Sequence, residues 1–145
     1  MKLFTVGFTK KSAEKFFDGL QSAGVKRVVD IRLNNVSQLA GFTKKDDLRY
    51  FCKAICNIEY IHVAELAPTP ELLEEVRKGK SDWTAYEHKF IDLLKARRIE
   101  KTIAPKIFDG DCLLCSEEKP IHCHRRLVAE YLKKKRGGID IHHLA

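Results

Sequence analysis

The chain has no long apolar run, no linker-like segment and no internal repeat. A helix that crosses a bilayer needs about 20 consecutive apolar residues, and no stretch of this sequence approaches that length. Segments rich in serine, proline and glycine, which typically join domains, are missing too. These absences exclude a transmembrane or repeat protein. A length of 145 residues suits one hydrophobic core, so we expect a single domain over residues 1–145.

A secretory leader is not recognisable either. The N-terminal segment contains a short apolar run that Lys10 and Lys11 interrupt, so it predicts a first strand rather than a signal peptide. The cysteine count is five, and an odd number argues against a disulfide framework. Disulfides are also rare in the reducing cytoplasm. We therefore expect a cytoplasmic protein whose cysteines are buried, reactive or bound to metal.

The charge balance is basic, with 27 lysines and arginines against 20 acidic residues and a net charge of +7. Much of the excess lies at residues 10–11, 44–45 and 133–136. A basic protein favours anionic partners such as small anions, nucleotides or nucleic acid. Basic residues are not interleaved with aromatic ones, however, so a solvated surface explains the lysines more simply. No membrane partner is expected, and the oligomeric state stays open.

Short apolar segments alternate with helical patterns along the whole chain. Strands are predicted at residues 2–7, 25–32, 58–63, 111–115 and 139–143, with helices at about 12–24, 43–56, 82–98 and 123–136 and another starting at 70. Such alternation predicts an α/β fold with a mainly parallel sheet of about five strands and helices on both faces. The pattern does not decide whether the last strand is parallel or antiparallel.

Polar side chains stand where the predicted strands end. In open parallel sheets, ligands bind beyond the carboxyl ends of the strands, and the predicted helix at 123–136 begins at the same edge. The sequence therefore predicts one site that collects Thr5, Gly7, Asp30, Arg32, Cys115, Glu117, Cys123, His124, Arg125 and His143.

Cys123 is the candidate nucleophile of this site. The first turn of a helix and the neighbouring Arg125 both stabilise a thiolate, and such a thiol suits attack on a phosphate or an electrophilic carbon. His124, Glu117 and Asp30 are candidates for proton transfer. The alternative for Cys123 is a small buried residue at a helix start.

Arg32 and Arg125 are the candidate anion-binding residues, because a guanidinium binds an oxyanion through two parallel hydrogen bonds. The alternative for Arg32 is a structural ion pair with Asp30. The remaining residues expected to line the substrate pocket are Cys115, Thr5, Gly7, Tyr86 and His143.

Two known sequence motifs are absent, the catalytic loop of cysteine-dependent enzymes and the phosphate-binding P-loop. A cysteine-dependent phosphatase or sulfurtransferase has a tight backbone cradle directly after the cysteine. Here Arg125 follows Cys115 by ten positions with no glycine between them. The segment does not match the glycine-rich P-loop either.

A metal site is suggested by composition and weakened by geometry. Cys112, Cys115 and the run at 122–124 offer five zinc ligands by count. If 111–115 is a strand, however, Cys112 and Cys115 point to opposite faces. We therefore assign no metal ligand, and the cofactor stays unknown. One alternative stays open, a site made of Cys115, Cys123 and either His124 or His143.

The same strand ends carry a resemblance to a known family. The motifs, in chain order, are Thr5-Val-Gly7-Phe-Thr9, Asp30-x-Arg32, Gly41-Phe42, Ile58-x-Tyr60-x-His62, Cys115-Ser-Glu117, Cys123-His124-Arg125 and Ile141-His-His143-Leu144. With them the chain resembles members of the domain-of-unknown-function family 488 over essentially its full length. The most specific piece is Cys-x-Glu followed by Cys-His-Arg at a helix start.

The resemblance implies an intracellular α/β protein with a shared site at these positions, and it places a tyrosine at the position of Tyr86. It implies no reaction. Cys112 and His122 lie outside the family pattern, and residues 65–68 replace its Leu-Gly-Gly-like turn.

The leading hypothesis is an enzyme that binds an anionic, phosphate-bearing substrate, resembling a nucleotide or nucleic acid, at the carboxyl edge of the sheet. One alternative is a non-catalytic nucleic-acid-binding module that uses the basic surface. The other is a fold stabilised by a bound metal.

Overall fold

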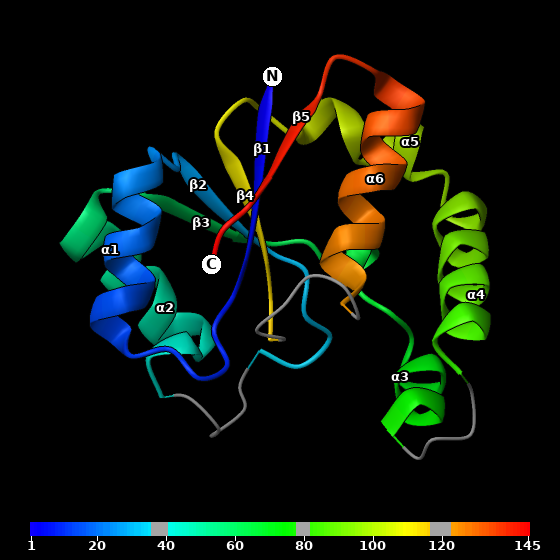
Figure 1. Ribbon diagram of the computed structural model, residues 1–145, viewed down its shortest axis with the longest axis horizontal. Coiled ribbons are helices and arrows are strands. Elements are labelled where there is room, and N and C mark those ends of the chain that lie inside the picture. Colours follow the sequence, from blue (N-terminus) through cyan, green and yellow to red (C-terminus); the bar gives the residue numbers. More distant parts are fainter. Residues whose placement is uncertain (36–40, 78–81, 117–122) are drawn as a thin grey trace.

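A parallel sheet forms the centre of the protein (Figure 1). The computed structural model describes residues 1–35, 41–77, 82–116 and 123–145. Within these ranges the sheet has five strands in the order β3-β2-β4-β1-β5, and every neighbouring pair is parallel. The strands are β1 Lys2–Gly7, β2 Arg27–Asp30, β3 Glu59–His62, β4 Asp111–Cys115 and β5 Asp140–His143. The predicted α/β fold is confirmed, and β5 extends the sheet in parallel beside β1.

The helical elements match most of the predicted segments. They are α1 Ala13–Ala23, η1 Gly41–Thr43, α2 Lys45–Phe51, η2 Cys52–Cys56, η3 Ala64–Leu66, α3 Pro70–Arg77, α4 Trp83–Ala96, α5 Ile99–Thr102, η4 Ala104–Lys106 and α6 His124–Arg136. The predicted helix over 43–56 starts at the last residue of the 3₁₀ turn η1 and is divided into the α-helix α2 and the π-helical turn η2. The short elements α5 and η4 were not predicted, because single turns are too short to show a helical period.

Capping residues set several of the helix boundaries. The Ser12 side chain accepts a hydrogen bond from the Lys15 N–H at 3.1 Å, and Asp82 accepts one from the Ala85 N–H at 2.8 Å. Such bonds satisfy N–H groups that the first helical turn leaves unpaired. Gly24 ends α1 with a φ of 79°, a left-handed conformation that glycine adopts without steric cost.

Helices cover both faces of the sheet (Figure 1). On one face, Phe16 and Phe17 of α1 pack in one core with the strand residue Leu114. On the other face, Leu127 of α6 packs in a second core with Leu113. Neighbouring β4 residues thus enter different cores, because successive strand side chains point to opposite faces.

The same alternation separates two cysteines of β4. Cys112 belongs to the core beneath α1, and Cys115 belongs to the core beneath α6. The predicted opposite orientation of these two side chains is therefore confirmed, and they cannot hold one ion together.

The connections that follow the central strands bring several polar residues to one edge. The neighbouring strands β2 and β4 lead to α2 and α6, which lie on opposite faces of the sheet (Figure 1). In α/β sheets, ligands bind at the carboxyl edge where connections diverge in this way. Of the described helices, none has both the length and the apolar character that a membrane crossing requires.

Candidate functional site

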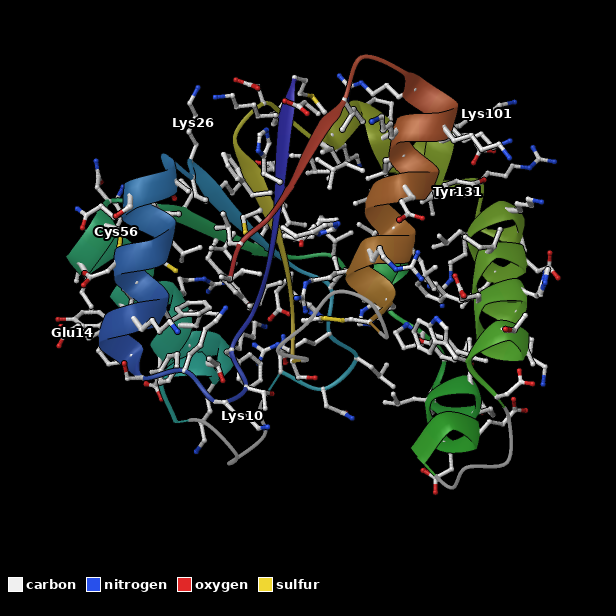
Figure 2. The ribbon with its side chains drawn as sticks, in the orientation of Figure 1. Lys10, Glu14, Lys26, Cys56, Lys101 and Tyr131 are labelled. Atoms are coloured by element: carbon white, nitrogen blue, oxygen red, sulfur yellow. A yellow bond between two sulfur atoms is a disulfide. The ribbon has the colours of Figure 1, made fainter. Side chains whose placement is uncertain are left out.

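Two cysteines meet where β4 ends and α6 begins. Cys115 is the last residue of β4, and Cys123 occupies the N-cap position of α6 without a side-chain capping bond. Their sulfurs form a disulfide, drawn in Figure 2 beside the start of α6. The two side chains are almost fully buried, and their Cα atoms lie 7.5 Å apart. The expectation that the cysteines form no disulfide is wrong for this pair, because a cysteine count does not show which two elements approach each other in space.

His124 is fixed by a hydrogen bond to the end of β2. Its Nε2 lies 2.7 Å from the carbonyl oxygen of Ile31. A carbonyl only accepts, so Nε2 carries the proton and Nδ1 keeps its lone pair. Burial lowers the pKa of His124 to about 4; the bond to Ile31 opposes this shift, and the charge of Arg125 adds to it. The imidazole is therefore neutral near pH 7.

Arg125 is fully buried in the first turn of α6. Its Nε donates to Thr5 Oγ1 at 3.3 Å, and its Nη1 lies 3.4 Å from Cys115 Sγ. Thr5 Oγ1 also shares a hydrogen bond of 2.6 Å with His143 Nδ1. Burial, followed by the charge of Arg125, lowers the pKa of His143. Residues from β1, β4, β5 and α6 thus meet around one guanidinium.

We call Cys115, Cys123, His124 and Arg125 the cysteine cluster. The two sulfurs and a ring nitrogen of His124 all lie within 4.8 Å of one another. Sulfur and imidazole nitrogen are the donors that zinc and similar transition metals prefer. The cluster therefore contains ligand atoms suited to a metal ion. It also contains the Arg125 guanidinium, which is suited to an anion.

A second buried group, the carboxylate cluster, comprises Asp30, Arg32, Thr43 and Tyr60. Arg32 donates to both carboxylate oxygens of Asp30, at 2.9 and 2.8 Å, and to the Thr43 carbonyl oxygen at 2.6 Å. The Tyr60 hydroxyl donates to Asp30 at 2.5 Å. Burial, followed by the hydrogen bond to Asp30, raises the pKa of Tyr60.

The contacts of Asp30 and Arg32 favour a buried ion pair, the alternative that the sequence left open. The Asp30 side chain is inaccessible to solvent, and the Arg32 guanidinium lies 5.3 Å from the ring centre of Phe8. Catalysis by Asp30 and anion binding by Arg32 stay predictions.

The two clusters lie at one edge of the sheet but on different faces of it. Tyr60 packs in the core beneath α1, whereas Cys115 and Cys123 pack in the core beneath α6. Ile31, one residue beyond β2, joins the clusters through its hydrogen bond to His124. The sequence analysis predicted one crevice for all these residues, whereas the structure divides them between two faces. The position of a strand end does not show toward which face the side chains beyond it turn.

Tyr86 lies one aromatic ring away from the cysteine cluster. It is buried and stacks on Phe90 at 6.0 Å, and the Phe90 ring lies 5.6 Å from the His124 ring. Burial raises the pKa of Tyr86. The sequence missed Phe90 as a neighbour of the site, although its spacing of four residues from Tyr86 on α4 places both on one helix face.

The remaining predicted residues divide into two groups. Gly7 is buried at the end of β1, pairs in register with Cys115, and accepts a hydrogen bond from Lys11 Nζ at 2.8 Å. Glu117 and His122 lie outside the described residues. The sequence also missed the partnership of Tyr60 with Asp30, which the neighbouring positions of β2 and β3 would allow.

Comparisons with known proteins give a family but no activity. No curated protein and no solved structure matches the chain. The model of one family, described as "Domain of unknown function DUF488", matches residues 12–132. This range includes every member of both clusters, whereas the neighbouring Thr5 and His143 lie outside it. The resemblance seen in the strand-end motifs is therefore confirmed, and the chain belongs to the DUF488 family.

Proposed function

We propose that the protein is an enzyme that binds an anionic, phosphate-bearing substrate at the cysteine cluster. A nucleotide or a nucleic-acid-like molecule has the required chemistry. One observation carries the proposal: the guanidinium of Arg125 is fully buried beside two sulfurs at the carboxyl edge of the sheet.

Arg125 supplies the charge for substrate binding. Its partners include Thr5 Oγ1 and Cys115 Sγ, a neutral oxygen and a sulfur, at 3.3 and 3.4 Å. Hydrogen bonds between a guanidinium and an oxyanion are shorter and roughly twice as strong as neutral ones. A phosphate oxygen therefore competes well with these two partners.

The sulfurs supply the reactive atoms. After reduction of the disulfide, Cys123 lies at the N-terminus of the 13-residue helix α6, whose dipole favours negative charge at that position. A ring nitrogen of the neutral His124 imidazole lies within 4.8 Å of both sulfurs. The groups proposed for substrate binding and for sulfur chemistry are therefore neighbours.

Arg125→Gln tests substrate binding, and Arg126→Gln is its matched control. Arg126 follows in the sequence but donates to Glu87 and Glu130, at 3.0 and 3.1 Å. Calorimetric titrations of the reduced protein would use inorganic phosphate, a nucleoside monophosphate and a short single-stranded oligonucleotide. Loss of one hydrogen bond to a charged group costs about 1.5–3 kcal/mol. We therefore expect roughly ten- to hundredfold weaker binding for Arg125→Gln and unchanged binding for Arg126→Gln.

Two results would contradict the proposal. The first is that none of the three probes binds, or that both arginine variants bind equally well. The second is oligonucleotide binding that falls steeply with salt and is unaffected by Arg125→Gln. That second outcome would favour the nucleic-acid-binding module, which would use exposed lysines such as Lys133–Lys135 at the far end of α6.

A further inference from the structure

Three metal-binding atoms converge in the cysteine cluster from two elements of the fold. Cys115 Sγ comes from β4, Cys123 Sγ from the N-cap of α6, and the His124 nitrogen from its first turn. All three lie within 4.8 Å of one another. Around a four-coordinate zinc ion the ligand atoms lie about 3–4 Å apart, since Zn–S and Zn–N bonds are about 2.3 and 2.0 Å long. A small adjustment would therefore bring all three into the coordination sphere of one ion.

The backbone spacing of the two cysteines also suits an ion between their sulfurs. Their Cα atoms are 7.5 Å apart, whereas disulfides usually hold this distance between about 4.4 and 6.8 Å. An ion between two thiolates spans a wider gap than a sulfur–sulfur bond does. The end of β4 and the start of α6 thus hold the two cysteines at a separation that a shared ion would fill.

The orientation of His124 matches that of a metal ligand. Its Nε2–H donates to the Ile31 carbonyl oxygen at 2.7 Å, which leaves the lone pair on Nδ1. Metal-binding histidines almost always donate their other ring N–H to a carboxylate or a backbone carbonyl in this way. The ring is therefore held in the tautomer that binding through Nδ1 requires.

The charges around the cluster would balance once an ion is bound. Two thiolates neutralise a divalent cation, and the imidazole is neutral. Arg125 Nη1 lies 3.4 Å from Cys115 Sγ and can donate to that sulfur. Hydrogen bonds to ligating sulfurs are a common way to tune metal centres. The same guanidinium is the group to which the proposed function assigns the anionic substrate.

We propose that Cys115, Cys123 and His124 bind one divalent ion of the zinc class when the disulfide is reduced. Three protein ligands leave a fourth position for water or substrate, as in catalytic zinc sites. The inference deepens the proposed function and rests on it for the occupant of that position. In vitro, a phosphine reductant supplies the two electrons that break the sulfur–sulfur bond. Binding of the ion to the two thiols then releases two protons.

Cobalt substitution tests the site directly. The untagged, reduced protein would be titrated with Co²⁺ and then with Zn²⁺ in competition. We expect one ion per chain, a near-ultraviolet sulfur-to-cobalt charge-transfer band and displacement of cobalt by zinc. Cys115→Ser, Cys123→Ser and His124→Gln should each weaken binding by more than the roughly 10–100-fold that loss of a supporting hydrogen bond costs.

Cys56→Ser is the matched control. Cys56 donates to the Phe17 carbonyl oxygen and lies beside α1, away from α6 (Figure 2). Its substitution should leave cobalt affinity unchanged. Circular dichroism of each metal-free variant would show that it is folded. The proposal fails if the wild type shows no charge-transfer band, or if Cys56→Ser weakens binding as much as the ligand variants do.

Two further measurements separate this inference from the proposed function. His122→Ala should keep the wild-type affinity for cobalt. A loss of affinity as large as that of the ligand variants would make His122 a fourth ligand and would overturn the open fourth position. Phosphate titrations would be repeated with the metal-free and zinc-loaded protein. Binding that depends on Arg125 without any metal site would leave the proposed function standing and refute the zinc site. A protein that binds zinc at this site but binds no anion would support the zinc site and refute the proposed function.

Discussion

The carboxylate cluster and the cysteine cluster both lie buried at the carboxyl edge of the sheet, and each contains an arginine. In the carboxylate cluster, Arg32 meets a full negative charge through two hydrogen bonds to Asp30. In the cysteine cluster, the partners of Arg125 include the Thr5 hydroxyl and a sulfur. The first arrangement satisfies an ion pair internally, whereas the second combines a cation with reactive donors. The contrast favours a structural role for the carboxylate cluster and leaves the cysteine cluster as the place where we propose the chemistry.

The largest effect should come from breaking the buried ion pair. Asp30→Asn leaves the buried Arg32 guanidinium without its counter-charge, and loss of one partner of such a pair costs about 3–5 kcal/mol. Urea unfolding would measure this change in the free energy of unfolding. Glu59→Gln on the neighbouring strand β3 is the control, because its pair with Lys53 is exposed and should contribute little to stability. A loss below about 1 kcal/mol for Asp30→Asn would remove the contrast between the clusters.

Metal should stabilise through the cysteine cluster alone. Zinc at a hundred times its dissociation constant should raise the free energy of unfolding of the reduced protein by about 2.7 kcal/mol. The increment should vanish in Cys123→Ser and persist in Tyr60→Phe. Urea unfolding with and without zinc would measure both. Loss of the increment in Tyr60→Phe would show that the clusters act as one unit.

A smaller effect should follow removal of the Tyr60 hydroxyl. This group donates to Asp30 at 2.5 Å inside the core beneath α1. Hydrogen bonds to charged groups contribute about 1.5–3 kcal/mol, so Tyr60→Phe should destabilise by that amount in chemical denaturation. The cobalt affinity of the reduced protein should stay the same. A stability equal to the wild type would mean that Arg32 alone satisfies the carboxylate.

The smallest effect should come from Cys123→Ser in the reduced, metal-free protein. Cys123 occupies the N-cap of α6 without a side-chain capping bond, and serine is a favoured N-cap residue worth about 1 kcal/mol over alanine. This gain offsets the cost of placing a hydroxyl in a buried position, so stability should change by less than about 1 kcal/mol. Thermal denaturation under reducing conditions would measure it. A larger loss would assign Cys123 a structural role in its own right.

Sequence patterns located the elements of the fold because those elements follow local rules. The apolar run at 111–115 matched β4 residue for residue, and the predicted helix starts at Ser12 and Asp82 are the N-caps of α1 and α4. These features depend on neighbours in the chain. The convergence of Cys115, Cys123, His124 and Arg125 was also predictable, since the carboxyl ends of parallel strands share an edge.

Side-chain partnerships beyond the strand ends were not predictable. Arg32 turns back onto Asp30 because the Thr43 carbonyl and the Phe8 ring, both distant in sequence, hold its guanidinium. The pairing of Cys115 with Cys123 likewise depends on how α6 approaches β4. Such contacts are set by packing between elements, which periodicity in one segment does not report.

The pairing of β5 with β1 has a consequence for how the protein folds. Residues 2–5 take residues 140–143 as their neighbours, and the Thr5–His143 hydrogen bond joins positions 138 residues apart. Closing so large a loop costs chain entropy before any contact rewards it, and such non-local pairing slows folding. The second edge of β1 is therefore covered only after β5, the last strand in the sequence, has paired with it. The wall of the site that contains Thr5 and His143 becomes complete only when that long-range closure occurs.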